Sequence, residues 1–148
     1  MRKPPPGRGI CERAARVADQ YGHGHRVKVL IVEDDLMQRR ALARLLTLEG
    51  YAVETAGAVN EASAKLDGQA VALLDLNLPD GLGTDLLKRI REAHPHISVV
   101  VLSAAVDALI TDAMNLGPDL FVRKPVDVAA LLQWLRAWAA QHPTPPPG

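Results

Sequence analysis

The sequence VKVLIVEDD, residues 27–35, decides the fold of this 148-residue chain. Its first part, Val27–Val32, is an aliphatic run of strand length that only Lys28 interrupts. A strand that is apolar at successive positions is buried on both faces, which is typical of a parallel sheet covered by helices on each side. The acidic residues Glu33, Asp34 and Asp35 follow directly, so this strand ends in a cluster of carboxylates.

Strand and helix patterns alternate along the rest of the chain. Four further strands are predicted at Tyr51–Thr55, Ala70–Leu74, Ile97–Leu102 and Leu120–Val122. Five strands that alternate with helices predict an α/β fold, a doubly wound, five-stranded parallel sheet flanked by five helices. In such sheets the functional site lies at the edge where the strands have their carboxyl ends.

Five helices are predicted between and after these strands. The first rests on Met37, Ala41, Leu45 and Leu48 at helical spacing before Gly50, and the second is a brief helix, Asn60–Leu66, before Gly68. The third is capped by Thr84 with Leu86, Leu87, Ile90 and Ala93 facing inward. The fourth begins at Asp107 and ends at Gly117-Pro118, and the last runs from its cap, Asp127, to about Ala140.

Composition limits the class of protein. A chain of this length with 48% hydrophobic residues is able to bury a core, so wholesale disorder is excluded. No apolar run approaches the 18 residues typical of a membrane span, and no secretory signal is visible. The single cysteine, Cys11, excludes an internal disulfide and fits the cytoplasm; an inert thiol is the expected state.

Charge divides the chain into parts, although its total is zero, with 17 basic and 17 acidic residues. Residues 1–26 hold six basic and two acidic residues and are expected to be a flexible basic arm. Residues 11–20 could form a short helix, but their apolar stripe is too narrow to dock firmly. Residues 27–140, with 11 basic and 15 acidic residues, are the predicted domain, and 141–148 are a Pro-rich disordered tail. The neutral total gives no sign of nucleic acid binding.

Polar residues follow the predicted strands at the edge where a site is expected. Asp75 follows the third strand, Ser103 the fourth and Lys124 the fifth, and they join the acidic cluster that begins at Glu33. Carboxylates without cysteine or histidine favour Mg²⁺ as the metal. A lysine and a hydroxyl are able to hold phosphoryl oxygens. The set is therefore suited to phosphoryl transfer to an aspartate.

Four blocks carry a family resemblance: LIVEDD at 30–35, LLDLNLPDG at 73–81, VLSA at 101–104 and FVRKP at 121–125. In this order and spacing they resemble the receiver domain of bacterial two-component response regulators, over about 27–140. The resemblance implies a flavodoxin-like fold with strand order 2-1-3-4-5. It also implies a signalling protein rather than an enzyme, apart from self-catalysed phosphoryl transfer and autodephosphorylation.

The resemblance implies a role for each matching residue. Asp75 would accept a phosphoryl group from a phosphohistidine on a histidine kinase or histidine phosphotransfer protein. Mg²⁺ would be held by Glu33, Asp34, Asp75 and the backbone carbonyl of Asn77. The phosphoryl oxygens would be held by Ser103 and Lys124, the switch would use Ser103 and Phe121, and the bond before Pro125 would be cis.

The output is expected to be contact with an unknown downstream protein or onward phosphotransfer. Only the Pro-rich tail follows the last helix, so direct nucleic acid binding is not expected. Phosphorylation would change the surface of the fourth helix, fifth strand and fifth helix, which could also form a homodimer. Trp134, at the edge of the inward arc of Val128, Leu131, Leu135 and Trp138, is either half-buried packing or an anchor on that surface.

Two other functions stay open at this stage. One is a binding module of the same fold that works without phosphorylation. The other is an enzyme resembling haloacid-dehalogenase-like phosphatases, in which a second aspartate is needed where this chain has Asn77. Gly81-Leu82-Gly83 fails as a dinucleotide loop, because Leu86 replaces the third glycine. His23-Gly24-His25 and His94-Pro95-His96 precede strands, at the opposite edge, and are expected to be solvated loop histidines.

Overall fold

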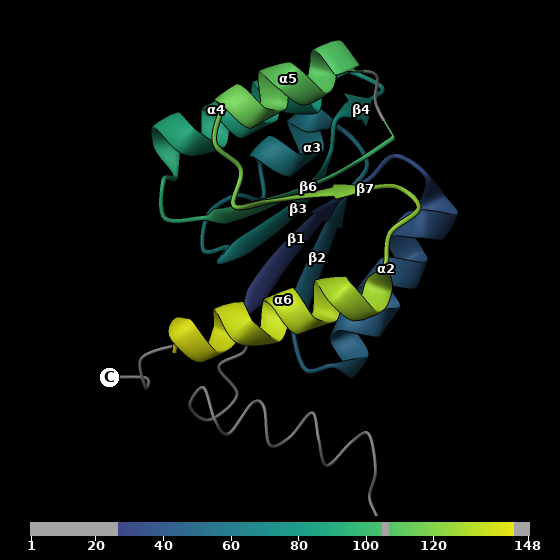
Figure 1. The fold of residues 1–148 in the computed structure, drawn as a ribbon, viewed down its shortest axis with the longest axis vertical. Coiled ribbons are helices and arrows are strands. Elements are labelled where there is room, and N and C mark those ends of the chain that lie inside the picture. The colour runs from purple at the N-terminus through teal and green to yellow at the C-terminus, as the bar shows by residue number, and fades with distance from the viewer. Residues whose placement is uncertain (1–26, 105–106, 144–148) are drawn as a thin grey trace, which may run out of the picture.

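A computed structural model describes residues 27–104 and 107–143 of the chain (Figure 1). The predicted basic arm, with Cys11 and the first histidine pair, lies outside the described residues, as do residues 144–148 of the predicted tail. Within the described ranges, no helix combines the length and hydropathy that crossing a bilayer requires.

The core of the fold is a parallel sheet of five strands. They are β1 (Lys28–Val32), β2 (Ala52–Ala56), β3 (Val71–Asp75), β6 (Ser98–Ser103) and β7 (Leu120–Arg123). Their order across the sheet is β2-β1-β3-β6-β7, and each neighbouring pair is parallel. Counted along the chain, this is the predicted order 2-1-3-4-5, so the doubly wound α/β fold is confirmed.

Helices cover both faces of the sheet (Figure 1). One face carries α2 (Leu36–Leu48) and α6 (Val128–Gln141), and the other carries α3 (Val59–Ser63), α4 (Gly83–Ala93) and α5 (Asp107–Asn115). The sheet accordingly separates two hydrophobic clusters. Leu30 and Val32 of β1 belong to the cluster under α3, α4 and α5, whereas Val29 and Ile31 belong to the cluster under α2 and α6. Burial of successive β1 residues explains the aliphatic run from which the fold was predicted.

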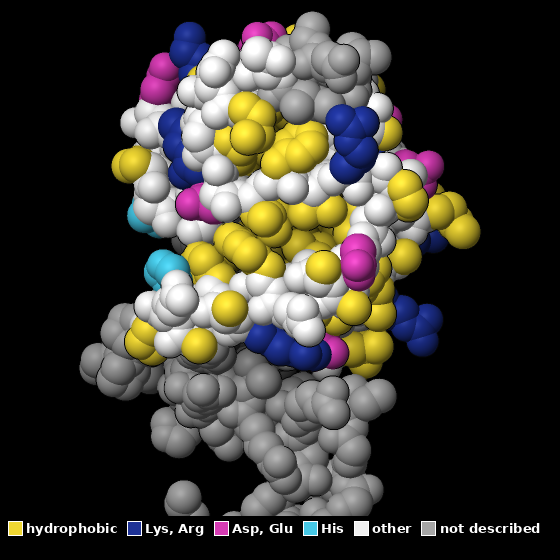
Figure 2. Space-filling view, viewed as in Figure 1, with side chains coloured by type: hydrophobic (Ala, Val, Ile, Leu, Met, Phe, Trp, Pro, Cys, Tyr) yellow, Lys and Arg dark blue, Asp and Glu magenta, His cyan; other side chains and the backbone are white. Residues whose placement is uncertain are grey.

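The cover over the edge strand is incomplete. Leu120, Phe121 and Val122 of β7 are only half-buried. Figure 2 shows hydrophobic side chains in a hollow on the face of the molecule that carries β7 and α6. This edge of the sheet therefore retains apolar surface in contact with solvent.

Several predicted helix ends are confirmed. Asp127 caps α6, with its carboxylate accepting a hydrogen bond from the Ala130 backbone N–H at 3.1 Å. Asp35, which was not predicted as a cap, caps α2 in the same way by accepting from the Gln38 N–H at 2.9 Å. Gly50 and Gly117 follow α2 and α5 with φ of 99° and 69°, a backbone region in which glycine carries no steric penalty.

The apolar spacing predicted the α2 helix but not its buried face. Leu46 is the fully buried residue of α2, and Leu42 and Ala43 pack beside it. Met37, Ala41, Leu45 and Leu48, from which the helix was predicted, are exposed, Met37 by 78%. The helix has apolar residues on two sides, and the side with fewer aliphatic residues in sequence is the one that packs on the sheet.

Two other helices differ in detail from the prediction. The predicted helix Asn60–Leu66 is Val59–Ser63, because Asp80 reaches across to its start and accepts from the Val59 and Asn60 N–H groups at 2.6 and 3.0 Å. These two bonds lower the pKa of Asp80. The helix predicted to follow a Thr84 cap begins two residues earlier, at Gly83, and its N-cap residue, Leu82, makes no side-chain cap. Ala93, predicted to face inward, is exposed.

A small hairpin between β3 and α4 was not predicted. It pairs β4 (Asn77–Leu78) with β5 (Gly81–Leu82) in antiparallel register. The hairpin folds the chain back on the end of β3, where the Gly83 N–H donates to the Leu76 carbonyl at 2.8 Å. A Cβ atom at Gly83 would lie 2.2 Å from the Asp75 carbonyl oxygen and 2.6 Å from the Leu76 Cα. Glycine is therefore required here by close approach to the backbone of Asp75.

Gly83→Ala is expected to lower the free energy of unfolding by about 2 kcal/mol or more. The added methyl group would overlap backbone atoms of Asp75 and Leu76, which can move apart only by distorting the end of β3. Gly81→Ala, in the same hairpin, is the matched control: its Cβ would lie 3.4 Å from Val59 Cγ2, an ordinary contact. We expect the control to cost less than about 1 kcal/mol. Urea titrations followed by circular dichroism measure both, and equal losses would contradict the role of Gly83.

Candidate functional site

The carboxyl ends of four strands bring the predicted site residues to one place. Asp75 is the last residue of β3 and Ser103 the last residue of β6, while Glu33 directly follows β1 and Lys124 directly follows β7. Glu33 and Asp75 are each 6% exposed, and Ser103 is fully buried. The pairing of β6 with β7 continues to the Lys124 N–H, which donates to the Ser103 carbonyl at 3.0 Å. The site is therefore part of the sheet edge itself.

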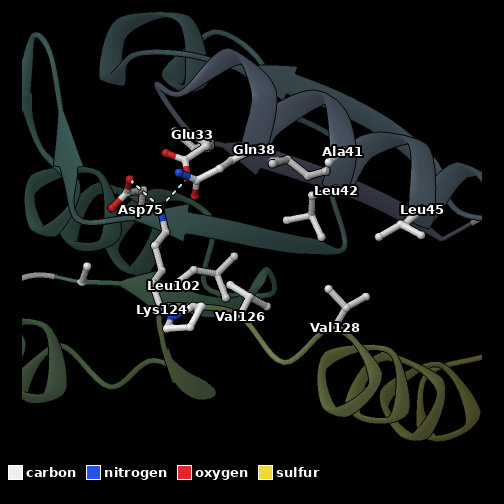
Figure 3. A pocket seen from close by; sticks show the side chains of 14 residues that line it. Glu33, Gln38, Ala41, Leu42, Leu45, Asp75, Leu102, Lys124, Val126 and Val128 are labelled. Atoms are coloured by element: carbon white, nitrogen blue, oxygen red, sulfur yellow. Dashed lines mark hydrogen bonds and ion pairs between the residues drawn. The ribbon is translucent and has the colours of Figure 1, made fainter.

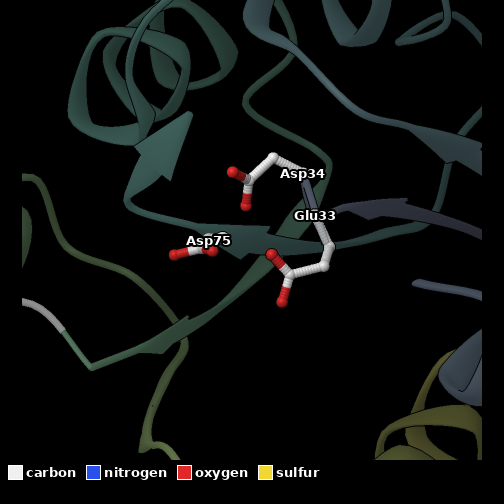
Figure 4. Close-up of side chains that lie close together, drawn as sticks. All are labelled: Glu33, Asp34 and Asp75. Carbon is white, nitrogen blue, oxygen red and sulfur yellow. The ribbon is translucent and has the colours of Figure 1, made fainter. Parts of the chain in front are cut away.

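Three carboxylates gather at this edge (Figure 4). One oxygen from each of Glu33, Asp34 and Asp75 lies within 4.8 Å of the others. Asp34 is exposed, whereas the other two side chains are buried. Negative charges at this separation repel one another, so a cation placed among them is stabilising.

Lys124 supplies one positive charge to the cluster. Its ammonium makes ion pairs with Glu33 Oε1 and, at 3.2 Å, with Asp75 Oδ2. Figure 3 shows the lysine side chain rising from the end of β7 with its Nζ between the two carboxylates. The Lys124–Pro125 peptide bond that follows is cis.

Burial and mutual repulsion change the ionisation of the cluster. Burial first, and then the neighbouring Asp75, raise the pKa of Glu33 to about 7, although Lys124 acts in the opposite direction. Burial would lower the pKa of Lys124, but the Glu33 and Asp75 carboxylates outweigh it and raise that pKa. Near neutral pH, the lysine is thus charged while Glu33 is close to its titration point.

Supporting contacts hold the acidic residues in place. The Asn77 backbone N–H donates to Asp75 Oδ1 at 3.2 Å, which orients the carboxylate. Arg39 Nη1 donates to the Glu33 carbonyl at 2.9 Å, with its guanidinium against Gly57. This contact of Arg39 was not predicted from the sequence. An arginine one turn into the helix after the acidic run is the signal that could have indicated it.

The remaining predicted residues lie around the site or away from it. Phe121 is half-buried in β7 and packs against the cluster under α3, α4 and α5. Trp134 is half-buried and packs against the opposite cluster. Asn77 is exposed beside Asp75. His94 and His96 precede β6, so they lie at the amino ends of the strands, away from the carboxylates, with their rings 6.0 Å apart.

Known proteins with similar sequences share one domain type. The family pattern described as "Response regulator receiver domain" matches residues 29–136. Transcriptional regulatory protein PmrA of Pectobacterium parmentieri is 36% identical over 115 residues, which cover 75% of this chain and 51% of PmrA. Acid tolerance regulatory protein ActR of Rhizobium meliloti (strain 1021) is 38% identical over 112 residues, 71% of this chain and 58% of ActR. The chain thus spans little more than half the length of these two relatives.

Solved structures agree with the sequence relatives. A CheY-like response regulator receiver domain protein from Methanospirillum hungatei JF-1 has a TM-score of 0.74 and 29% identity, covering 79% of this chain and 96% of that one. The structure of the CheX–CheY–BeF₃–Mg²⁺ complex from Borrelia burgdorferi gives a TM-score of 0.70 and 29% identity, with 78% and 90% covered.

The raised pKa of Glu33 predicts how stability depends on pH. The folded protein keeps a proton on Glu33 up to about pH 7, whereas a free glutamate loses it near 4.5. This contribution to the free energy of unfolding is therefore complete below the lower value and is lost as pH rises through the higher one. In EDTA at pH 8, Glu33→Gln should raise the free energy of unfolding by about 1–3 kcal/mol, and at pH 4.5 it should have little effect.

The matched control is Glu92→Gln, which removes an exposed carboxylate of α4. It should change stability by less than about 0.5 kcal/mol at both pH values. Denaturant titrations at the two pH values measure the difference. A destabilised Glu33→Gln at pH 8 would show that the Lys124 ion pair outweighs the cost of burying the Glu33 charge.

Proposed function

This chain belongs to the response regulator receiver domain family of two-component signalling, and on that premise we propose that it accepts a phosphoryl group on Asp75. The observation that carries the proposal is the position of Asp75 at the end of β3, between two further carboxylates and the Lys124 ammonium, whose Nζ lies 3.2 Å from Asp75 Oδ2. An ionised carboxylate is a nucleophile, and a cation within reach neutralises the charge of an incoming phosphoryl group.

The step forms one bond and breaks one. A carboxylate oxygen of Asp75 attacks phosphorus, so a P–O bond forms while the P–N bond of the donor phosphohistidine breaks. The imidazole nitrogen leaves with the electron pair and takes a proton from solvent. Lys124 Nζ and the Ser103 hydroxyl hold the transferred phosphoryl oxygens, each contributing a donor at the edge of the sheet. Later attack by water on the phosphoryl group releases inorganic phosphate and restores Asp75. In this proposal the protein is a signalling switch and not a turnover enzyme.

The donor set at this site fits Mg²⁺. Carboxylate oxygens are the ligands this ion prefers, and Glu33, Asp34 and Asp75 offer three of them within 4.8 Å. In this proposal, the backbone carbonyl of Asn77 is the fourth protein ligand of Mg²⁺. When bound, the ion supplies positive charge to the carboxylates and to the phosphoryl oxygens. A similar chain in the Borrelia burgdorferi complex was solved with BeF₃ and Mg²⁺, which supports this assignment.

The phosphoryl donor of the proposal is a histidine kinase or a histidine phosphotransfer protein in the cytoplasm. Phosphorylation draws Ser103 toward the phosphoryl group and allows Phe121, half-buried in β7, to move inward. The changed surface is that of α5, β7 and α6. Through it, the domain signals by contact with a downstream protein, by homodimer formation or by passing the group onward. Trp134 packs on the sheet from α6, so its contribution to that surface is through packing.

Intact mass after incubation with acetyl phosphate tests the acceptor. With Mg²⁺, we expect the mass of one added phosphoryl group, no adduct in Asp75→Asn, and a strong loss of adduct when EDTA replaces Mg²⁺. Asp85→Asn is the matched control, because Asp85 is an exposed carboxylate in the first turn of α4; it should be labelled like the original protein.

Each alternative function gives a different outcome. A folded protein that takes no phosphoryl group would favour a binding module that works without phosphorylation. Multiple-turnover release of phosphate from other phosphate esters would favour a phosphatase. An adduct that persists in Asp75→Asn would move the acceptor to another residue and contradict the proposal.

A further inference from the structure

Two of the three clustered carboxylates are carried by one short stretch of backbone. Glu33 and Asp34 follow β1 directly, and their carboxylates lie beside Asp75 (Figure 4). A shift of this backbone would move two potential metal ligands together. Because Mg²⁺ demands a nearly ideal octahedral arrangement of ligands, such a shift weakens its binding even when every carboxylate is present. The contacts that hold this stretch therefore belong to the geometry of the site.

The backbone of Glu33 is held at both of its hydrogen-bonding groups. Its N–H donates to the Ala56 carbonyl at the end of β2, at 3.0 Å. Its carbonyl accepts from Arg39 Nη1 at 2.9 Å, and the same nitrogen makes a longer contact of 3.5 Å with the Asp34 carbonyl. The Arg39 side chain thus reaches back from α2 to the two residues that carry the carboxylates.

The acceptors that Arg39 uses distinguish it from Lys124. The lysine ammonium pairs with Glu33 Oε1 and Asp75 Oδ2, oxygens that are also potential metal ligands. Within the described part of the chain, the hydrogen-bond acceptors of Arg39 are the two backbone carbonyls. Arg39 therefore fixes the acidic stretch without occupying a carboxylate oxygen.

Gly57, which directly follows β2, leaves the space in which the guanidinium lies. A Cβ atom at this position would lie 2.8 Å from Arg39 Nη1, which is closer than a Cβ contact allows. Gly57 is not one of the described glycines with positive φ, so its backbone conformation does not itself require glycine. The guanidinium accounts for the absence of a side chain at residue 57.

We propose that Arg39 is a positioning residue for the metal ligands of the acidic site, and that Gly57 provides the space for its guanidinium. This inference rests on the proposed function, in which Glu33 and Asp34 bind Mg²⁺. Residues that orient metal ligands without touching the ion typically contribute about 10–100-fold to metal affinity. Arg39 acts in this way, through the backbone of the residues that supply the carboxylates.

A role of Arg39 through its charge alone gives the opposite expectation. A guanidinium near the site repels Mg²⁺, so its removal would strengthen Mg²⁺ binding if charge were its only effect. Loss of its hydrogen bond to Glu33 instead releases the acidic stretch and weakens Mg²⁺ binding. The direction in which the Mg²⁺ dissociation constant changes therefore distinguishes positioning from charge.

Titration of the ¹⁵N-labelled full chain with MgCl₂, followed by amide chemical shifts, measures this dissociation constant. Arg39→Met keeps an unbranched side chain but removes its donors, and we expect the constant to rise about tenfold. Arg40→Met removes the same charge from an exposed neighbour on α2 and should leave the constant unchanged or slightly lower. Urea titrations in EDTA confirm that each variant is folded under the conditions of the binding measurement.

Gly57→Ala tests the same contact from the other side. Its methyl group would meet the end of a flexible side chain, so the protein should stay folded while the guanidinium is displaced. The Mg²⁺ dissociation constant should rise as it does in Arg39→Met. In the double variant the two effects should not add, because no guanidinium is left for the methyl group to displace.

A further readout needs no metal. In EDTA, ¹⁵N relaxation should show larger motions of the Asp34 and Asp35 amides in Arg39→Met than in the original protein. The amides of β3 should be unchanged, because that strand is bonded to β1 and β6 independently of Arg39.

Three results would overturn the proposal. A Mg²⁺ dissociation constant that falls or stays the same in Arg39→Met would show that the guanidinium does not position the ligands. Full additivity of Gly57→Ala and Arg39→Met would show that Gly57 acts independently of Arg39. Unchanged relaxation of Asp34 and Asp35 would show that the acidic stretch is held without Arg39. If the original protein binds no Mg²⁺, the proposed metal site itself fails, whereas unchanged affinity in a variant of a protein that binds Mg²⁺ contradicts the role of Arg39 alone.

Discussion

The Lys124 ammonium, placed between Glu33 and Asp75, is the interaction on which the site depends. Two buried carboxylates at one edge of a sheet repel each other, and burial alone raises the pKa of Glu33. The lysine reduces this cost without removing it, because the pKa of Glu33 still reaches about 7. The cluster is thus under-neutralised near neutral pH, which is the electrostatic condition for taking up a further cation.

The fold determines where these carboxylates come close enough to repel one another. Because all five strands are parallel, their carboxyl ends lie at one edge, so an acidic run after β1 and an aspartate after β3 become neighbours although Asp34 and Asp75 are 41 positions apart in sequence. Three sets of contacts fix the position of Asp75. Its carbonyl lies against Gly83, its carboxylate accepts from the Asn77 N–H, and its strand is bonded to β1 and β6. A carboxylate held in this way, with side chains from other strands beside it, fits the role of phosphoryl acceptor that we propose for Asp75.

The sequence was sufficient for the strands and for the residues at their ends, because both follow from short-range patterns. Continuous aliphatic runs indicate strands that are buried on both faces. Polar residues directly after such runs indicate the edge of the sheet at which the site lies. It was insufficient for α2, where apolar residues on two sides compete and only the packed structure shows that Leu46 faces the sheet. It also missed Gly83 and Arg39, whose roles depend on atoms of Asp75, Glu33 and Gly57 brought close by the tertiary fold.

Helix α2 borders both the acidic site and an apolar groove of about 610 Å³ beside it, and this connects the two. The helix is capped by Asp35, adjacent to the carboxylate cluster, and from its first turn Arg39 bonds to the Glu33 carbonyl. Gln38, Ala41 and Leu45 line the groove from the same helix. A shift of α2 would therefore also shift Arg39, whose guanidinium holds the backbone of Glu33 through its carbonyl.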